Sequence, residues 1–483
     1  MKRTNQSRVE KLQRREMLKA AGGCAALTNT SLLSTIFSLS ATNAAVAQNN
    51  GLTGYKAMVC LFLFGGNDSY NLLSPLTAGE REDYLTARGG VYQPDSGGLG
   101  LPADELHSII DPGSGRSFGI HPSMPETKSL YDSGKLGFLS NVGSLVEPTT
   151  KADYQAQSNL PLGLFSHADL QRHWMTSVPQ TRSQVTGWAG RIADLVSGAT
   201  NSNQNISMNM SINNVNMLQT GGSVVPYVIT HNGSQEVGWY GPTWTQARIF
   251  KTLTDDVLSR SYGNLIESTF AKANRNALDA AIEFNNATSA VTAVDNFFPE
   301  DADASNLQKQ MRMIAKTIGA QATLGQNRQI FFVSQGGWDN HDELINNQAE
   351  NLEMVSQALK NFQDAMDGLG MTDNVVTFTA SDFARTLNSN GKGSDHGWGG
   401  NQIVMGGPVR GGRVHGDYPT SLAPGNDLDV GRGRLIPTTS VDEMAAELAM
   451  WYGVENDNNM EVILPNIRNF LRSGDGYPIG FIS

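Results

Sequence analysis

The sequence has little cysteine and no long apolar run. Of its two cysteines, Cys24 lies in an N-terminal segment that we expect to be removed, which leaves Cys60 as the single thiol. One thiol cannot form an internal disulfide, and the apolar run around Cys60 predicts a small buried hydrophobe. Beyond the N-terminal segment, no run reaches the roughly 18 consecutive apolar residues that a membrane-spanning helix needs. We therefore expect a mature chain without a disulfide or a transmembrane segment.

Positive charge is also scarce, because 35 Lys and Arg residues stand against 46 Asp and Glu residues. The formal net charge is −11 at pH 7, and removal of a basic N-terminal segment makes it more negative. Nucleic-acid binding depends on clustered Lys and Arg side chains that neutralise phosphates. The charge balance therefore predicts that nucleic acid is not a partner.

The first 47 residues have the order of an export signal. Arg14 and Arg15 precede a weakly apolar run rich in Ala, Gly and Ser, which ends in the small-residue pattern Ala45-Val46-Ala47. This order is similar to a twin-arginine signal, and the alternative is a chance arginine pair in a basic tail. We expect a twin-arginine signal peptide at 1–47 and a domain at 48–483. The twin-arginine translocase would export that domain folded, to the periplasm or beyond.

The stretch from Ile330 to Gly407 organises the rest of the chain. Two strand-like runs, 330–334 and 375–379, each end in a polar loop, which is where open α/β sheets carry their chemistry. Between them, apolar residues recur at three- and four-residue spacing and predict a one-faced helix of the length that a β-α-β crossover needs. Those residues are Leu352, Val355, Leu359, Phe362 and Met366. The unit is therefore predicted to be parallel and buried.

Two other regions complete the predicted organisation. Residues 57–64 form an unbroken apolar run, typical of a central parallel strand. Residues from about 202 to 298 carry no chemical motif and are interpreted as an insertion or subdomain, with strand-like alternation followed by helical sequence. The whole is an α/β chain in which an insertion interrupts the main domain.

Acidic residues and histidines follow the predicted strands where they would meet at one edge of a sheet. They are Asp68, Asp339, His341, Asp382 and His396. Mixed carboxylate and imidazole ligands favour zinc or manganese, whereas an oxygen-dominated site would take magnesium or calcium. The alternative is a set of surface turns and hydrogen-bonding side chains without an ion. Asp68, which follows two glycines, suits a helix N-cap as well as a metal ligand.

Two further residues are candidates for catalysis. Ser166 precedes a predicted helix, where its hydroxyl would face free N–H groups and the positive end of the helix dipole. The same position suits an ordinary N-cap. Arg385 follows Asp382, and its planar guanidinium would either clamp an anionic substrate or pair with that acid.

Seven short motifs, in this order, resemble the exported bacterial domain-of-unknown-function family fifteen-oh-one. They are Gly65-Gly66-Asn67-Asp68, Ile120-His121-Pro122, Ser166-His167, Gly187-Trp188-Ala189-Gly190-Arg191, Gly337-Trp338-Asp339-Asn340-His341, Ser381-Asp382-Phe383-Ala384-Arg385-Thr386 and Gly393-Ser394-Asp395-His396-Gly397. The resemblance spans nearly the whole mature chain. It implies a place in the alkaline phosphatase and sulfatase superfamily, with a mainly parallel central sheet flanked by helices on both faces and a metal site at the strand ends.

The resemblance also implies roles for individual residues. Asp339 with His341 and the later His396 are similar to metal ligands of that superfamily, and Asp68 and Asp382 to its acids. Two departures stand out. Phe383 occupies the place of an expected imidazole, and the spacing of two residues between Asp339 and His341 is shorter than the superfamily spacing of four.

Two functions follow from these residues. The first is a periplasmic, metal-dependent hydrolase of phosphate or sulfate esters, in which Ser166 or a bound water attacks an anionic small-molecule or envelope substrate. The second is a non-catalytic binding or assembly protein of the cell envelope that retains the fold. The phenylalanine at position 383 favours the second function, because it removes an expected ligand.

Overall fold

The computed structural model describes residues 52–483, except positions 95, 213, 241, 455–456 and 471–477. The expected signal peptide at 1–47 lies outside the described residues. No helix within the described residues is long and apolar enough to cross a membrane.

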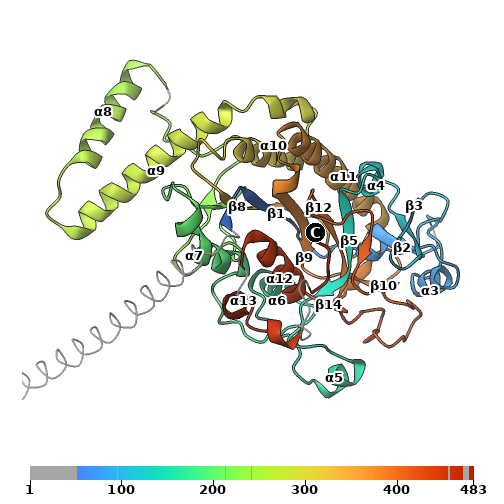
Figure 1. Ribbon diagram of the computed structural model, residues 1–483. Helices are drawn as coiled ribbons and strands as arrows, with labels where there is room; N and C mark the ends of the chain where they lie inside the picture. Colours follow the sequence, from blue (N-terminus) through green and yellow to red (C-terminus); the bar gives the residue numbers. More distant parts are fainter. Residues whose placement is uncertain (1–51, 95, 213, 241, 455–456, 471–477) are drawn as a thin grey trace, which may run out of the picture. The chain divides into compact units, whose positions relative to one another are not determined.

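A mainly parallel sheet forms the centre of the described chain (Figure 1). Its path runs β13-β5-β12-β9-β1-β8-β6-β7, and β14 pairs with β5. The strands are β1 (Lys56–Leu63), β5 (Leu136–Gly143), β6 (Asn209–Ser211), β7 (Tyr227–Val228), β8 (Arg328–Gln335), β9 (Val375–Ser381), β12 (Gly400–Met405), β13 (Val414–His415) and β14 (Thr439–Ser440). β1 lies between β8 and β9 and is parallel to both, while β12 is antiparallel to β5 and β9. The predicted α/β fold with a mainly parallel sheet is confirmed.

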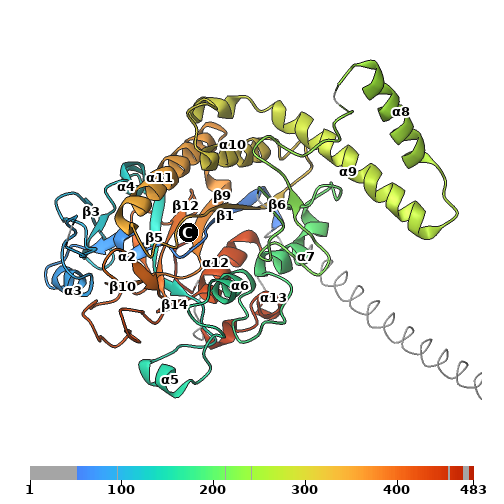
Figure 2. The same cartoon turned by 180° about the vertical axis from the view of Figure 1, so that it is seen from behind.

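Helices cover both faces of the sheet (Figures 1 and 2). One layer contains α4 (Pro125–Asp132), α10 (Asn306–Gly319) and α11 (Leu344–Gly368), and the other contains α6 (His167–Thr176), α7 (Trp188–Thr200), α12 (Val441–Tyr452) and α13 (Asp457–Ile463). Because both faces are covered, β1 has no polar face, and all residues from Ala57 to Leu63 are buried. This explains its unbroken apolar sequence.

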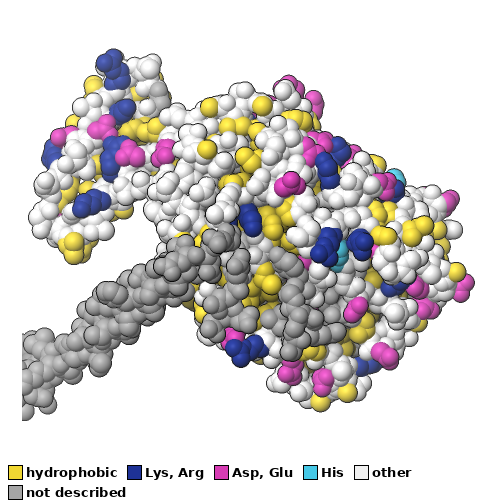
Figure 3. Space-filling view, in the orientation of Figure 1, with side chains coloured by type: hydrophobic (Ala, Val, Ile, Leu, Met, Phe, Trp, Pro, Cys, Tyr) yellow, Lys and Arg dark blue, Asp and Glu magenta, His cyan; other side chains and the backbone are white. Residues whose placement is uncertain are grey.

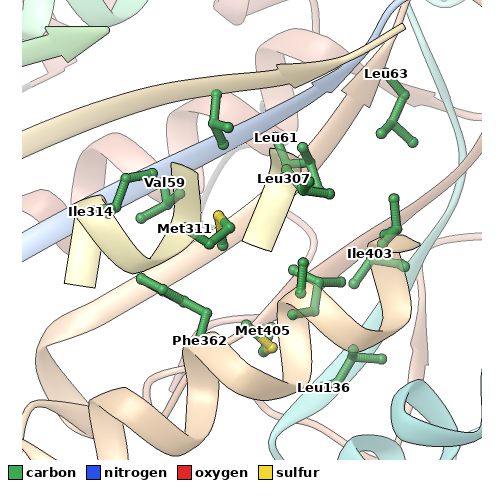
Figure 4. Close-up of a cluster of buried hydrophobic side chains, with 14 of the residues drawn as sticks. Val59, Leu61, Leu63, Leu136, Leu307, Met311, Ile314, Phe362, Ile403 and Met405 are labelled. Carbon is green, nitrogen blue, oxygen red and sulfur yellow. The ribbon is translucent and has the colours of Figure 1, made fainter. Parts of the chain in front are cut away.

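The core between the sheet and α10 and α11 is built from residues at alternating strand positions and one face of each helix (Figure 4). Val59 of β1 lies beside Met311 and Ile314 of α10, and Leu61 lies beside Leu307 of the same helix. The predicted apolar stripe of α11 is buried at all five positions: Leu352, Val355, Leu359, Phe362 and Met366. The helix between the two strands is therefore confirmed.

The remaining elements surround this framework. A three-stranded sheet contains β2 (Leu73–Pro75), β3 (His107–Ile110) and β4 (Ser117–Ile120), and a hairpin contains β10 (Arg385–Ser389) and β11 (Ser394–His396). Other helices are α2 (Ser69–Leu72), α3 (Glu80–Ala87), α5 (Lys151–Ala156), α8 (Thr245–Ser259), α9 (Leu265–Ser289), and the 3-10 helices η2 (Ala293–Phe297), η3 (Thr372–Asn374) and η4 (Ile467–Asn469). The segment expected as an insertion, 202–298, supplies β6 and β7 to the central sheet as well as α8 and α9.

Candidate metal centre

Segments from distant parts of the sequence meet at the carboxyl edge of the central sheet. β1, β8 and β9 run in the same direction, and Leu63 at the end of β1 lies opposite Gln335 and Ser381. The loops that follow these strands therefore leave the sheet at one edge. Hydrogen bonds join them there to the β10–β11 hairpin and to the start of α6.

The carboxylate of Asp339 lies at the centre of three imidazoles, and we call these four residues the Asp339 cluster. Its Oδ1 is 3.0 Å from Nε2 of His341 and 3.3 Å from Nε2 of His396. Its Oδ2 is 3.4 Å from Nε2 of His167. The four side chains are between 23% and 45% exposed, so a small molecule can reach them from solvent.

Each histidine of the Asp339 cluster is oriented by a hydrogen bond from Nδ1 to an oxygen outside the cluster. The acceptors are the Asp382 carboxylate for His167 (2.7 Å), the Asp395 carboxylate for His341 (3.0 Å) and the Phe165 carbonyl for His396 (2.7 Å). Ionised carboxylates and carbonyls only accept hydrogen bonds, so Nδ1 carries the proton in each ring. In the neutral imidazole the lone pair then lies on Nε2, which faces Asp339. Metal-ligating histidines in proteins are held in this manner.

The spacing of the donor atoms fits one cation. Nε2 of His341 is 3.0 Å from Nε2 of His396, and donor atoms of His167, Asp339 and His396 all lie within 4.8 Å of one another. That separation suits a cation between the two lone pairs, and it also suits a hydrogen bond when one Nε2 carries a proton. Zinc–nitrogen bonds of about 2.0–2.1 Å in tetrahedral geometry place ligand atoms about 3.3 Å apart. The separations between an Asp339 oxygen and each Nε2, 3.0 to 3.4 Å, are close to this spacing.

The surroundings of the cluster shift the pKa values of Asp339 and His396 toward the forms that can bind a metal, the ionised carboxylate and the neutral imidazole. Partial burial acts to raise the pKa of Asp339, but the hydrogen bond and charge of Arg385 outweigh it, and the pKa is lowered. Burial lowers the pKa of His396, which favours the neutral imidazole. Burial also raises the pKa of Asp382, although bonds from Gln171 and His167 work against this shift.

A family model described as "Protein of unknown function (DUF1501)" matches residues 55–449. The chain belongs to the DUF1501 family. The resemblance seen in the short motifs is thereby confirmed, and the match includes every member of the Asp339 cluster. A search of curated proteins gives no match.

Several solved structures are similar to this DUF1501 chain. The lipoteichoic acid synthase LtaP from Listeria monocytogenes has a TM-score of 0.34 at 9% identity, over 86% of this chain and 76% of that one. The C-terminal periplasmic domain of EcEptC from Escherichia coli, in complex with Zn, has a TM-score of 0.34 at 9% identity, over 87% and 89%. Alkaline phosphatase from the Antarctic bacterium TAB5 has a TM-score of 0.21 at 11% identity, over 74% and 93%. At these TM-scores the similarities assign no activity.

His167 is the member of the cluster that the sequence interpretation misses. In the sequence it stands only in the Ser166-His167 motif, whereas the other candidates follow predicted strands. His167 instead opens α6, and its imidazole enters the cluster from a helix. No local sequence pattern identifies it, because its partner Asp382 lies far along the chain; Gln171, one helical turn later, donates to the same Asp382 oxygen at 2.8 Å.

His167 also accounts for the phenylalanine at position 383. The ring of Phe383 stacks on His396 with centroids 4.5 Å apart and lies 4.8 Å from the ring of His167. Phe383 is thus an apolar wall of the cluster, and the imidazole beside Asp382 comes from α6. In this DUF1501 chain, Asp382 therefore has an imidazole partner although position 383 is a phenylalanine.

Arg385 is engaged inside the protein. Nη1 lies 2.6 Å from Oδ1 of Asp339, while Nη2 and Nε bond the carbonyl and hydroxyl oxygens of Ser394. The side chain is fully buried. The geometry therefore favours a structural pairing, although the partner is Asp339 and not Asp382 as the sequence suggested.

Asp68 lies in a buried ion pair with Arg88 and is not part of the Asp339 cluster. It precedes α2, but its side chain makes no capping hydrogen bond. The guanidinium of Arg88 also donates to the carbonyls of Thr386 and Leu387. Through Arg88, Asp68 connects the loop after β1 to strand β10. The positive group beside the Asp68 carboxylate is therefore the Arg88 guanidinium.

Ser166 is the N-cap of α6, and its hydroxyl accepts a hydrogen bond of 3.5 Å from the Asp169 backbone N–H. Ser166 lies between Phe165, whose carbonyl accepts a hydrogen bond from His396, and His167, which belongs to the Asp339 cluster. Phe165 has φ = 70°, a conformation that a bulky side chain rarely adopts. Such strain is concentrated at functional sites.

Two glycines allow the loop after β1 to approach the cluster closely. Gly65 and Gly66 have φ values of 122° and 89°. A Cβ on Gly65 would lie 2.5 Å from the backbone nitrogen of Asp339, and one on Gly66 would lie 2.4 Å from the Phe383 ring. The Gly-Gly pair is therefore required by packing against two loops of the site.

Proposed function

We propose that this protein is a metal-dependent hydrolase of phosphate or sulfate esters. One observation carries the proposal: three imidazoles direct Nε2 toward Asp339, and each is oriented through Nδ1 by an acceptor outside the cluster. The three Nε2 atoms converge on one carboxylate, and each ring is fixed by its own acceptor, as in metal-ligating histidines. A surface turn does not need so many oriented polar side chains.

The proposed ligands are His167, Asp339 and His396, with His341 adjacent to two of them. Mixed nitrogen and oxygen donors at this spacing favour zinc or manganese over magnesium or calcium. A divalent ion held there would lower the pKa of a bound hydroxyl or water and stabilise negative charge on the transferred group. Asp382, which the sequence suggested as a ligand, would instead orient the ring of His167, and Asp395 would orient the ring of His341.

The attacking group would be the Ser166 hydroxyl or a water molecule. Ser166 is half-buried at the N-terminus of α6, next to His167, and its side chain also hydrogen-bonds the side chain of Asp169. The helix N-terminus and the nearby imidazoles would favour the alkoxide over the neutral hydroxyl. The unusual backbone of Phe165 would set the position of both Ser166 and the carbonyl that holds His396.

An anionic substrate would fit the exposed cation beside the cluster, Arg432, which bonds Asp395. Arg432 is about half exposed and bonds the outer oxygen of Asp395, which leaves other guanidinium donors open to solvent. Lys392 is more exposed still, but it lies 3.6 Å from the Asp342 carboxylate and lines a separate cavity that contains no member of the cluster. We assign the substrate-clamping role suggested for Arg385 to Arg432, because the donors of Arg385 are bonded to Asp339 and Ser394.

We also propose that the chain acts outside the cytoplasm, after export by the twin-arginine translocase. The support is the Arg14-Arg15 pair, the apolar run and the small-residue pattern before Gln48. Export of a folded chain would suit a site whose members come from several separate segments, because all of them must be in place before an ion binds.

The decisive experiment measures metal content and hydrolysis together. Mature protein would be analysed by inductively coupled plasma mass spectrometry and assayed on p-nitrophenyl phosphate and p-nitrophenyl sulfate. We expect a near-stoichiometric transition metal in the wild type and loss of metal and turnover in His396→Ala and Asp339→Asn. His231→Ala, a histidine outside the cluster, serves as the matched control and should retain both.

Two results would contradict the proposal. A folded wild type that binds no divalent metal would remove the metal centre. A tightly bound metal without hydrolysis across a wide ester panel would favour the non-catalytic envelope protein, in which the ion stabilises the fold. The melting temperature with and without chelator separates these two results, because a bound ion raises the stability of the folded state.

A further inference from the structure

A polar cavity of about 270 Å³ lies at the edge of the central sheet opposite the Asp339 cluster. Its lining comes from the end of α7, from residues 203–208, which lead into β6, and from residues 223–227, which lead into β7. β7 is parallel to β6, and β6 is parallel to β8, whose carboxyl end leads to Asp339. Segments that enter parallel strands and segments that leave them lie at opposite edges of a sheet. The cavity is therefore separate from the proposed metal centre.

The lining of this cavity carries no formal charge. Within the described residues, no Asp, Glu, Lys, Arg or His side chain lines it. On the face seen in Figure 3, blue and magenta side chains mark α8 and α9, whereas the surface next to them is mainly white. A charged ligand in the cavity would lose water without gaining an oppositely charged partner, which costs free energy. The lining therefore favours a neutral ligand.

Two amides of the lining have hydrogen-bonding groups to spare. The Asn205 side chain is exposed and makes no hydrogen bond within the described residues. Gln204 donates from Nε2 to the carbonyls of Ser197 and Asn201, which leaves its Oε1 to accept a bond from a ligand. Amides both donate and accept, so they match hydroxyl groups. A purely apolar ligand would leave these amides without partners.

Apolar side chains supply the rest of the lining. Val225 is 66% exposed, although valine is apolar, and Tyr227 contributes an aromatic ring. That ring is held by Phe284, with ring centroids 5.8 Å apart, and by a 2.8 Å hydrogen bond between its hydroxyl and Ser234. Apolar surface beside free amides suits a ligand that has both hydroxyl groups and C–H faces, as a sugar ring has.

The two loops that line the cavity are held by side chains of the surrounding structure. The Asp194 carboxylate of α7 accepts hydrogen bonds of 2.6 to 3.0 Å from the three consecutive backbone N–H groups of residues 222–224. Gln326 donates from Nε2 to the carbonyls of Asn203 and Ile206, at 3.0 and 3.1 Å. A cavity whose backbone is fixed in this way binds a ligand with a smaller cost in ordering.

We propose that this cavity binds a neutral saccharide. Sugar hydroxyls bond the side chains of Asn205 and Gln204, and the C–H face of the ring lies against Val225 and Tyr227. The volume is slightly below the roughly 300 Å³ at which cavities for drug-sized ligands begin, so about one or two sugar rings fit. This binding goes beyond the proposed ester hydrolysis and does not depend on the metal centre.

Isothermal titration calorimetry of the mature protein tests the proposal. The probes are maltose, cellobiose and diacetylchitobiose, with a 6-sulfated form of each as the charged comparison. We expect a neutral disaccharide to bind and its sulfated form to bind more weakly. Asn205→Ala should raise the dissociation constant about 2- to 10-fold, because one hydrogen bond is lost. Asn286→Ala, an exposed asparagine of α9 outside the cavity, is the matched control and should bind as the wild type does.

A second variant tests the apolar part of the lining without disturbing the core. Val225→Asp places a carboxylate in the cavity at an exposed position and should weaken binding, whereas Val185→Asp, equally exposed but outside the cavity, should not. Far-UV circular dichroism would verify that each variant is folded. His396→Ala should bind the disaccharide normally, so failure of the metal proposal would leave this one standing.

Three results would overturn the proposal. The first is a wild type that binds none of the neutral disaccharides. The second is binding that stays unchanged in both Asn205→Ala and Val225→Asp, because the ligand would then lie elsewhere on the protein. The third is tighter binding of the sulfated forms, because an uncharged cavity has no group that favours the sulfate.

Discussion

The Nδ1 atom of His167 lies 2.7 Å from Oδ2 of Asp382, although 215 positions separate the two residues in the sequence. One residue opens helix α6, and the other follows strand β9. This contact brings the third imidazole to Asp339 and determines which of its nitrogens faces the cluster. The metal proposal therefore depends on an interaction that no local sequence pattern contains.

Replacement of Asp382 by Asn should weaken metal binding without abolishing it. The variant removes the negative charge that holds the Nδ1 proton of His167, and loss of such an orienting acceptor lowers metal affinity about 10- to 100-fold. Competition with a chromophoric chelator would measure the change. Asp132→Asn, at an exposed surface pair, is the control and should bind as the wild type does. Equal affinities for Asp382→Asn and the wild type would show that the orientation of His167 does not matter.

Replacement of Arg88 by Met should strongly destabilise the fold. The guanidinium and the Asp68 carboxylate are both buried, so the variant leaves a buried carboxylate without its partner. Breaking a buried ion pair in this way costs about 3–5 kcal/mol. Urea unfolding would measure the loss, with Lys128→Met as the control, because an exposed pair on one helix contributes less than about 1 kcal/mol. A small effect of Arg88→Met would mean that water or a cation compensates Asp68.

His173 should make the protein less stable in mild acid. Burial lowers its pKa to about 4 from 6.5, and neither ring nitrogen has a hydrogen-bond partner among the described residues. The unfolded chain therefore binds a proton between pH 6.5 and 4 that the folded chain does not bind. The free energy of unfolding should fall as pH decreases through this range.

The variant His173→Phe isolates that contribution. Its stability relative to the wild type should increase steadily from pH 6.5 to pH 4, because the buried phenyl ring does not titrate. Urea unfolding at each pH, with chelator present so that metal binding does not interfere, would measure the difference. Parallel stability curves for the two proteins would show that His173 is not responsible for the pH dependence.

Conversion of Arg14 and Arg15 to Lys should block export. The twin-arginine pathway requires the arginine pair, whereas a general basic segment would tolerate lysine. Cell fractionation should find the wild type processed and outside the cytoplasm, and the variant retained as a precursor. Arg8→Lys leaves the pair intact and should be exported normally. A processed, exported double variant would identify the arginine pair as incidental.

Much of the fold could be predicted from local pattern. The unbroken apolar run of β1 and the helical spacing from Leu352 to Met366 depend only on burial and on the periodicity of strands and helices. The placement of Asp339, His341 and His396 close together followed from loops at the carboxyl ends of neighbouring parallel strands and from the hairpin that follows β9. Their role as ligands stays a prediction.

The sequence by itself determined the α/β architecture and the acidic and imidazole side chains available at one sheet edge, because both follow from residue type and short-range spacing. Only the tertiary structure decided the partner of each side chain. It placed His167 beside Asp382, paired Asp68 with Arg88, and engaged Arg385 with Asp339. Hydrogen bonds and ion pairs between distant segments depend on distances of a few ångströms, and these exist only once the sheet and its helices have packed.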